Sequence, residues 1–455
     1  MDRLQFPLLP DLPSRTGRVV PRPLPAAPLT PQETGLPLSF LVELVAKLML
    51  QHGLTRLNDL GTHLGLTATV VEAVCQFMRA ESLLEVARRG KQEADVEYEL
   101  TQAGRARASE WLARNRYAGP APVTLQAYTE RVQAQSLSHQ TITREQVLAA
   151  FAGLVVPPHL IDLFGTAVNS GRPLLLHGPA GSGKSYLAEQ LHRLLPGHVA
   201  IPHALCVNGE VIRVFDPQCH QPVVAPARGG AALDARQRSD ARWLLCERPR
   251  IVCGGELTLE MLDLSFDAGA GFYEAPPHFK ANNGLFIVDD LGRQIVSPRA
   301  LMNRWVVPMD RRHDHLMLRS GGKFTIPFDM TLVFSSNLGP ADLEDAAFLR
   351  RLGHKIEIGE LSAEDYALVF EGACAAEGLR PDPVVFWHLL RHLHPTHERP
   401  LLACTPRDLL HLVASRARFT GQPRELSCAD IDWAWDAYFG HEAPNGSAAD
   451  TRRLA

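Results

Sequence analysis

The sequence predicts an α/β fold in which a parallel sheet flanked by helices is preceded by a small helical module and followed by a helical lid. Three observations predict the sheet. A glycine-rich loop at 178–185 lies between an apolar strand and a helix, a second apolar strand ends in Asp289 and Asp290, and a third ends at Asn337. Strands that are apolar on both faces are typical of parallel sheets buried between helices.

The size and composition suit a soluble protein of several domains. The 455 residues allow about two to four domains, and the contents of 45% hydrophobic and 21% charged residues are ordinary for sizeable cores. No run approaches the ~18 apolar residues of a membrane-spanning helix, which excludes an integral membrane protein. The formal net charge of -4 argues against a general binder of polyanions.

Cysteine usage and the N-terminus favour a cytoplasmic location. The eight cysteines are scattered and form no C-x-x-C pair, which argues against a disulfide scaffold or a zinc ribbon and favours reduced thiols. Prolines interrupt the chain from Pro7 onward and leave no apolar segment of the secretory type, so we do not expect export.

Three segments are predicted to lie outside the folded domains. The proline-rich arm 1–36 has no apolar periodicity and is predicted to be disordered or polyproline II. It is a solvated tail or, through its leucines, a docking peptide. Residues 119–142 are predicted to be a linker, and residues 441–455 a frayed tail.

Residues 37–118 are predicted to form a compact module. Apolar residues recur at helical spacing from Phe40, and strand 96–100 alternates apolar with acidic residues before a last helix. Three helices, a hairpin and a helix resemble a winged helix-turn-helix domain. Its third helix carries Arg79 against Glu72 and Glu81, a poor complement to phosphates. This balance of charges favours docking of the module to a protein, with DNA binding as the alternative.

The glycine-rich loop fits the pattern G-x-x-x-x-G-K-[ST] and precedes a helix with leucines at helical spacing. Its glycines allow backbone N–H groups to turn toward phosphate oxygens, and the helix N-terminus adds partial positive charge. Lys184 would reach the β- and γ-phosphates of ATP, and Ser185 would offer its hydroxyl to Mg²⁺. The residues predicted to bind the nucleotide are Gly178, Pro179, Ala180, Gly181, Ser182, Gly183, Lys184 and Ser185.

The strand before Asp289 and Asp290 predicts the second half of the same site. It delivers two acids at the carboxyl end of a buried parallel strand, where ligands gather in α/β sheets. Asp289 would hold Mg²⁺, mostly through its water shell, and Asp290 would polarise the attacking water. The strand resembles a Walker B element, in which the second acid is usually glutamate; the side chain of Asp290 is one methylene shorter.

These motifs resemble those of AAA+ ATPases, with a core at 143–359 and a lid at 360–440. The resemblance implies that Asn337 is the sensor 1 residue, which helps to orient the lytic water. It implies that Arg407, in the stretch T-P-R-D-L, is the sensor 2 residue that touches the γ-phosphate of the same chain.

The resemblance also implies an arginine finger, which acts on the nucleotide of a neighbouring subunit. Arg350 and Arg351 occupy that segment, and Arg351 is favoured by the family's R-F dipeptide although Leu352 replaces the phenylalanine. For each of these arginines and for Arg407, the alternative is a surface salt bridge.

Within the family, the stretch 271–284 resembles a run shared by MoxR-type ATPases, magnesium chelatases, minichromosome-maintenance helicases and enhancer-binding activators. The continuation from Asp290 to Arg311 resembles the MoxR pattern. Two hairpins are predicted, one around the Asn208-Gly209 turn and one at 313–327, and in this branch the second points into the channel of a ring. The aromatic residues Phe272, Tyr273 and Phe279 either grip a polymer or pack in the core.

The function expected from these observations is ATP hydrolysis coupled to remodelling of an unidentified protein client by a ring, expected to be a hexamer. One alternative is a DNA-acting motor or transcription regulator that uses the N-terminal module. The other is a nucleotide-switched scaffold that binds ATP and barely hydrolyses it, which the aspartate at position 290 would suit.

Overall fold

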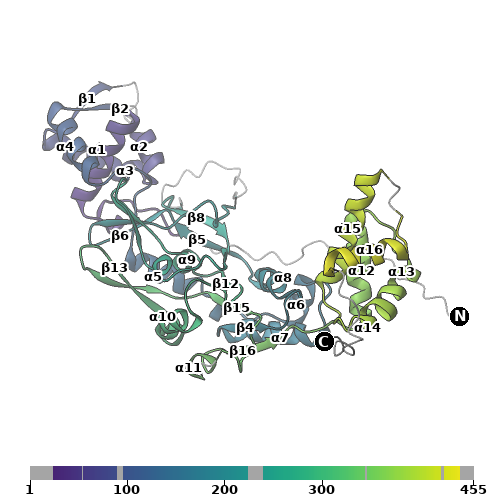
Figure 1. Ribbon diagram of the computed structural model, residues 1–455. Coiled ribbons are helices and arrows are strands. Elements are labelled where there is room, and N and C mark those ends of the chain that lie inside the picture. Colours follow the sequence, from purple (N-terminus) through teal and green to yellow (C-terminus); the bar gives the residue numbers. More distant parts are fainter. Residues whose placement is uncertain are drawn as a thin grey trace, which may run out of the picture.

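The computed structural model describes residues 24–53, 55–89, 96–223, 239–343, 346–421 and 425–440. Figure 1 shows three parts in a row: a helical module with a small hairpin at one end, a central body built on sheets, and a helical bundle at the other end. In this described part of the chain, no helix has both the length and the apolar character needed to cross a membrane.

The N-terminal module has the predicted order of elements. They are α1 (Leu38–His52), α2 (Leu57–Leu64), α3 (Ala68–Ala80), β1 (Leu84–Arg89), β2 (Val96–Leu100) and α4 (Gln102–Arg114). The strands β1 and β2 pair antiparallel. A Cβ at Gly104 would collide with the carbonyl oxygen of Leu83, so glycine allows α4 to pack closely behind the hairpin. The resemblance to a winged helix remains a prediction.

The segment 119–142 differs from the predicted linker. It contains β3 (Val123–Thr124), α5 (Leu125–Ala134) and the 3₁₀ turn η2 (Leu137–His139). Strand β3 pairs in parallel with β6 (Ala204–Val207), and Tyr128 and Val132 of α5 are buried. Because these apolar side chains are buried, the segment is part of the body. The prolines and polar residues around them obscure this in the sequence.

A second sheet connects the module to the body, in the order β10-β11-β7-β6-β3. Its other strands are β7 (Glu210–Arg213), β10 (Ser265–Asp267) and β11 (Phe272–Glu274). The hairpin β6–β7 turns at Asn208 and Gly209, whose φ values are 51° and 82°, as the Asn-Gly dipeptide predicted. Ala204 and Val211 belong to the same apolar core as α1–α3, so the module and this sheet are packed as one unit.

Two further strand pairs flank these elements. Strand β5 (His198–Pro202) pairs antiparallel with β8 (Trp243–Glu247). The predicted second hairpin is β13 (His313–Met317) with β14 (Lys323–Pro327), and its turn contains Gly321 at a φ of 84°.

The central sheet is fully parallel, in the order β16-β4-β15-β12-β9. Its strands are β4 (Leu174–His177), β9 (Arg250–Cys253), β12 (Leu285–Val288), β15 (Thr331–Ser336) and β16 (His354–Glu357). Alternate residues enter two separate cores: Leu174 and Leu176 pack with α6–α8, and Leu175 packs with α10. The α/β prediction of a parallel sheet between helices is therefore confirmed.

The helices and 3₁₀ turns of the body are α6 (Arg144–Ala150), α7 (Pro158–Ser170), α8 (Lys184–Gln190), η3 (Leu191–Leu194), η5 (Glu260–Leu262), α9 (Pro277–Lys280), α10 (Pro298–Arg311) and α11 (Ala346–Leu349). After β16 the chain forms a bundle around the buried side chains of Tyr366, Phe370, Leu409 and Trp435. Its helices are α12 (Ala363–Glu377), α13 (Pro383–His388), the π-helix η6 (Leu389–Leu393), α14 (His394–Thr396), α15 (Cys404–Thr420) and α16 (Cys428–Phe439).

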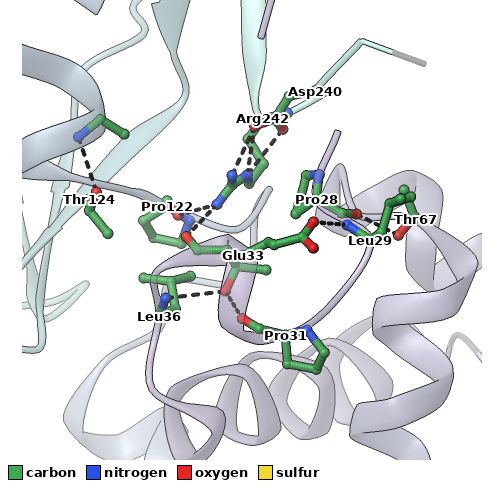
Figure 2. Close-up of polar contacts among 12 residues, drawn as sticks. Pro28, Leu29, Pro31, Glu33, Leu36, Thr67, Pro122, Thr124, Asp240 and Arg242 are labelled. Atoms are coloured by element: carbon green, nitrogen blue, oxygen red, sulfur yellow. Dashed lines mark hydrogen bonds and ion pairs between the residues drawn. The ribbon is translucent and has the colours of Figure 1, made fainter. Parts of the chain in front are cut away.

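A buried ion pair lies where the module, the second sheet and the N-terminal segment meet (Figure 2). Arg242 and Asp240 have side chains only 7% and 2% exposed, and their closest N–O distance is 2.8 Å. Arg242 also donates from Nη1 to the carbonyl oxygen of Thr34 at 3.0 Å and to that of Pro122 at 3.4 Å. One guanidinium therefore joins three segments that are distant in the sequence.

The N-terminal segment 24–36 is the part of the predicted arm that the structure describes, and it makes specific contacts. It contains the 3₁₀ turn η1 (Gln32–Thr34). The hydroxyl of Thr67, at the N-cap of α3, donates to the carbonyl oxygen of Pro28 at 2.8 Å, as Figure 2 shows. The amide of Asp240 donates to Pro25 at 2.8 Å. In this stretch the expectation of a free arm was wrong, because these long-range contacts hold it; residues 1–23 and 441–455 lie outside the described residues.

Candidate active site

The glycine-rich loop connects β4 to α8 and bends sharply at its glycines. Gly178, Gly181 and Gly183 have φ values of 145°, 85° and 95°, a region that residues with side chains rarely adopt. A Cβ at Gly178 would collide with the carbonyl oxygen of Ile358, and one at Gly181 with Sγ of Cys404 in the lid. The amide of Cys404 also donates to the carbonyl oxygen of Gly181 at 3.0 Å, so loop and lid are in direct contact.

Lys184 begins α8 and is almost fully buried, with 5% of its surface exposed. Its Nζ donates to the carbonyl oxygens of Gly178 and Pro179 and to Oδ1 of Asn337, the last over 2.8 Å. Burial lowers the pKa of this ammonium from its ordinary value, and the nearby carboxylates of Asp290 and Asp289 oppose that shift.

Ser185 and Asp289 meet although 104 positions separate them in the chain. The hydroxyl of Ser185 donates to Oδ1 of Asp289 over 2.8 Å. Ser185 is in the first turn of α8, and Asp289 follows the last residue of β12, so the carboxyl edge of the sheet brings them together. A hydroxyl beside a carboxylate is a suitable pair of oxygen ligands for Mg²⁺.

Asp290 and Asn337 also lie close to Lys184. Strand β15 runs between β4 and β12, so the residue that follows it, Asn337, lies between the loop and the acids. Its Nδ2 is 3.4 Å from Oδ1 of Asp290, within hydrogen-bonding range. Four predicted residues, Lys184, Asp289, Asp290 and Asn337, are thus in one place.

The three predicted arginines are in two different places. Arg407, in the first turn of α15, lines the same pocket as the loop; its side chain is 72% exposed and pairs with Asp408. Arg350 and Arg351 follow α11 and do not line that pocket. Arg351 pairs with Asp310 over 2.8 Å, whereas Arg350 is exposed. A residue that acts on the nucleotide of a neighbouring subunit must lie outside the pocket of its own chain, and both arginines meet this requirement.

A pocket of about 950 Å³ contains the loop, Asp290 and Asn337. Its other walls come from segment 153–160, residues 357–361 and the lid helices α12 and α15. These walls contribute apolar surface from Leu154, Val155, Leu368 and Ala373, which come from separate segments and carry no local sequence signal. Arg293 also lines the pocket, and its position three residues after Asp290 is the signal that could have identified it.

The donors around this pocket fit a phosphate-bearing ligand. The first N–H groups of α8 have no acceptor within the helix and lie beside the ammonium of Lys184. The hydroxyl of Ser182 is buried and has no hydrogen-bond partner among the described residues. Apolar walls beside such donors are the usual composition of a nucleotide pocket.

The aromatic residues considered for gripping a polymer lie mainly in the core. Tyr273 and Phe279 are each 1% exposed, so the gripping role was wrong for both. Phe272 is half-buried against Tyr117, with ring centroids 5.6 Å apart. The rings of Tyr273 and Phe279 share a core with Tyr128 of α5, where burial is favourable, whereas Phe272 packs against the core of the N-terminal module.

Comparison with known proteins gives one family match and several similar folds. A family described as a domain of unknown function (DUF8689) matches residues 362–437, which is the lid. No curated protein matches the chain.

Among solved structures, the chain is similar to RuvB from Thermotoga maritima, a Holliday junction branch migration motor. The TM-score is 0.35 and the identity 11%, over 62% of this chain and 69% of that one. It is also similar to NtrX from Brucella abortus, with a TM-score of 0.39 and 15% identity over 62% of this chain and 55% of that one. NtrX in complex with ADP gives a TM-score of 0.38 at 12% identity, over 63% of this chain and 56% of that one. All three similarities are at low sequence identity.

Proposed function

We propose that the protein is an ATP hydrolase of the AAA+ type, which works as a ring, a hexamer in our proposal, to remodel a protein client. The observation that carries this proposal is the convergence of five residues at one edge of the central sheet: Lys184, Ser185, Asp290 and Asn337 line the pocket, and Asp289 is hydrogen-bonded to Ser185. They come from three strand ends of one parallel sheet. The cytoplasm, where ATP is abundant, is the proposed location.

Each residue has a role in binding that follows from its chemistry. The loop N–H groups and Lys184 would hold the phosphates, and Arg407 would reach the γ-phosphate from the lid. Ser185 and Asp289 would hold Mg²⁺, which when bound neutralises charge on the phosphate oxygens. The apolar walls around Leu154 and Leu368 would receive the base.

Hydrolysis requires a water placed in line with the γ-phosphate and a group that polarises it. Asp290 would accept a hydrogen bond from that water, while Asn337 would orient it from the neighbouring strand. Arg350 or Arg351 would supply positive charge to the nucleotide of the adjacent subunit, so that a monomer lacks part of its active site.

The experiment compares steady-state ATP hydrolysis and binding of a fluorescent ATP analogue in the wild type, Lys184→Ala and Asp290→Asn. We expect Lys184→Ala to lose binding, and Asp290→Asn to bind ATP and to hydrolyse it at a strongly reduced but measurable rate. The control is Lys355→Ala, because Lys355 is an exposed lysine of the same sheet that does not line the pocket. Sedimentation with and without magnesium-ATP measures assembly.

Two results would contradict the proposal. Absence of binding at millimolar ATP from a protein that also stays monomeric would remove its basis. Equal and negligible hydrolysis in all three proteins, with binding intact in the wild type, would favour the nucleotide-switched scaffold.

A separate experiment identifies the client. The Asp290→Asn variant is used to capture associated molecules, which are then identified.

The DNA-binding alternative receives less support. In helix-turn-helix proteins, the N-terminal residues of the recognition helix contact the base edges. Here the hydroxyl of Thr67 at that end of α3 is bonded to Pro28 of the N-terminal segment. A Cβ at Gly65, just before α3, would lie only 2.9 Å from the backbone of Ala241. Binding of duplex DNA that weakens with added salt would favour this alternative.

A further inference from the structure

The backbone of Asp290 adopts an uncommon conformation. Its φ is 50°, in the left-handed region, which residues with a Cβ seldom adopt. Such a conformation persists only when the surrounding structure fixes it, and it is concentrated at functional sites. The contacts that fix it in this protein are therefore of functional interest.

The side chain of Gln294 bridges the two sides of the turn that contains Asp290. Its Nε2 donates to the carbonyl oxygen of Asp289 at 2.7 Å, and its Oε1 accepts from the amide of Gly292 at 2.9 Å. The amide of Arg293 closes the turn by donating to the carbonyl oxygen of Asp290 at 2.9 Å. The side chain of Gln294 is 8% exposed, and both of its hydrogen bonds are partly buried.

The opposite side of the turn is hydrogen-bonded to β15, the strand that precedes Asn337. The amide of Leu291 donates to the carbonyl oxygen of Ser335 at 2.7 Å. The hydroxyl of Ser336, which is fully buried, donates to the carbonyl oxygen of Leu291 at 2.8 Å and accepts from the amide of Leu338 at 3.0 Å. Asp290 is thus held between Gln294 and β15.

We propose that Gln294 is a positioning residue that holds the Asp290 carboxylate beside Asn337, and that this bridge sets the rate of hydrolysis without contributing to nucleotide affinity. This inference rests on the proposed ATPase function. Gln294 acts through the backbone of Asp289 and Gly292, whose positions determine where the Asp290 side chain begins. A misplacement of about 1 Å can cost on the order of 10²-fold in rate.

The substitution Gln294→Met removes both hydrogen bonds at similar volume. The matched control is Gln135→Met, because Gln135 is also a buried glutamine, 4% exposed, whose side chain bonds both backbone groups of one residue, Ala200. We expect Gln294→Met to lower kcat by about 10–100-fold with unchanged affinity for the ATP analogue. We expect the control to lower the melting temperature and to keep kcat.

A double-mutant cycle separates positioning from general destabilisation. If Gln294 acts through Asp290, the double variant Gln294→Met/Asp290→Asn should hydrolyse ATP no more slowly than Asp290→Asn alone. Additive losses, or a kcat for Gln294→Met equal to that of the wild type, would overturn the inference. A wild type without hydrolysis would instead count against the proposed function, so the two failures are distinguishable.

A second measurement does not depend on turnover. Hydrogen exchange without nucleotide should show faster exchange of the amides of 290–293 in Gln294→Met than in the wild type, while exchange in β4 stays unchanged. Unchanged exchange at 290–293 would show that the bridge does not hold this turn and would overturn the inference even for a variant with reduced activity.

Discussion

The ammonium of Lys184 donates a hydrogen bond to Oδ1 of Asn337 over 2.8 Å, across a separation of 153 positions in the chain. The contact exists because β15 lies next to β4 in the sheet, so the residue after one strand faces the loop after the other. The residue proposed to orient water is thereby fixed relative to the residue proposed to hold phosphate.

This relationship predicts different effects for the two residues. Asn337→Ala should lower kcat by about 10²-fold and leave ATP affinity almost unchanged, because the role proposed for Asn337 is to orient the water, whereas the role proposed for Lys184 is to hold the phosphates. Kinetics and analogue binding, with Lys184→Ala in parallel, measure both. A variant of Asn337 that loses affinity and keeps kcat would contradict the assigned role.

The proposed arginine finger predicts complementation between inactive subunits. Arg350→Ala and Arg351→Ala should each be assayed, and the true finger variant should lose most hydrolysis because its neighbour lacks positive charge in the transition state. Mixing that variant with Lys184→Ala subunits should restore part of the activity, since some interfaces then contain both intact residues. Arg351 is paired with Asp310, so Asp310→Ala tests whether that pair matters for activity. No recovery at any mixing ratio would argue against action between subunits.

The buried pair of Arg242 and Asp240 predicts a large contribution to stability where the N-terminal segment meets the second sheet. Arg242→Met leaves Asp240 as a buried charge without its partner, which should cost about 3–5 kcal/mol. We expect a lower urea midpoint, reported by the fluorescence of the adjacent buried Trp243. The control is Arg144→Met, because Arg144 and Asp162 form an exposed pair, 61% accessible on both sides, worth at most about 1 kcal/mol. Equal midpoints for the two variants would contradict this prediction.

The buried cluster of His278, Arg304 and Asp314 predicts loss of stability in acid. Burial alone would raise the pKa of Asp314, but hydrogen bonds from His278 and Arg304 and their positive charge outweigh it and lower the pKa to about 2. Burial also lowers the pKa of His278 from its ordinary value. Both folded-state pKa values lie below those of the unfolded chain, so the unfolded chain takes up protons first as the pH falls.

The stability that His278 contributes should therefore decrease below about pH 6.5, and that from Asp314 between about pH 4 and pH 2. Thermal melting as a function of pH measures this loss. Asp314→Asn should lower stability at neutral pH and make its dependence between pH 4 and pH 2 shallower, whereas Asp162→Asn, at an exposed carboxylate, should leave the profile unchanged.

Elements with a local signal could be predicted from the sequence. The loop between β4 and α8 and the turn at Asn208 and Gly209 depend on glycine, whose conformational freedom acts within a few residues. Three of the parallel strands, β4, β12 and β15, were identifiable because each is a short apolar run followed by polar residues. The residues that converge in the site were predictable as a set, since each follows such a strand or begins the helix after it.

Other features could not be predicted because their signal is not local. Residues 119–142 look like a linker by their prolines and polar side chains, and only pairing of β3 with β6 and burial of Tyr128 place them in the body. Similarly, nothing in the sequence around Arg242 and Asp240 indicates which distant segments cover their ion pair.

The sequence by itself determined the chemical groups available to this protein, namely the loop, the acids and the strand ends that present them, because turn chemistry and periodicity act over a few residues. Only the tertiary structure decided which of these groups touch. The contact of Ser185 with Asp289 and the bridge from Gln294 to the turn at Asp290 depend on strand order and burial, which distant parts of the chain set together.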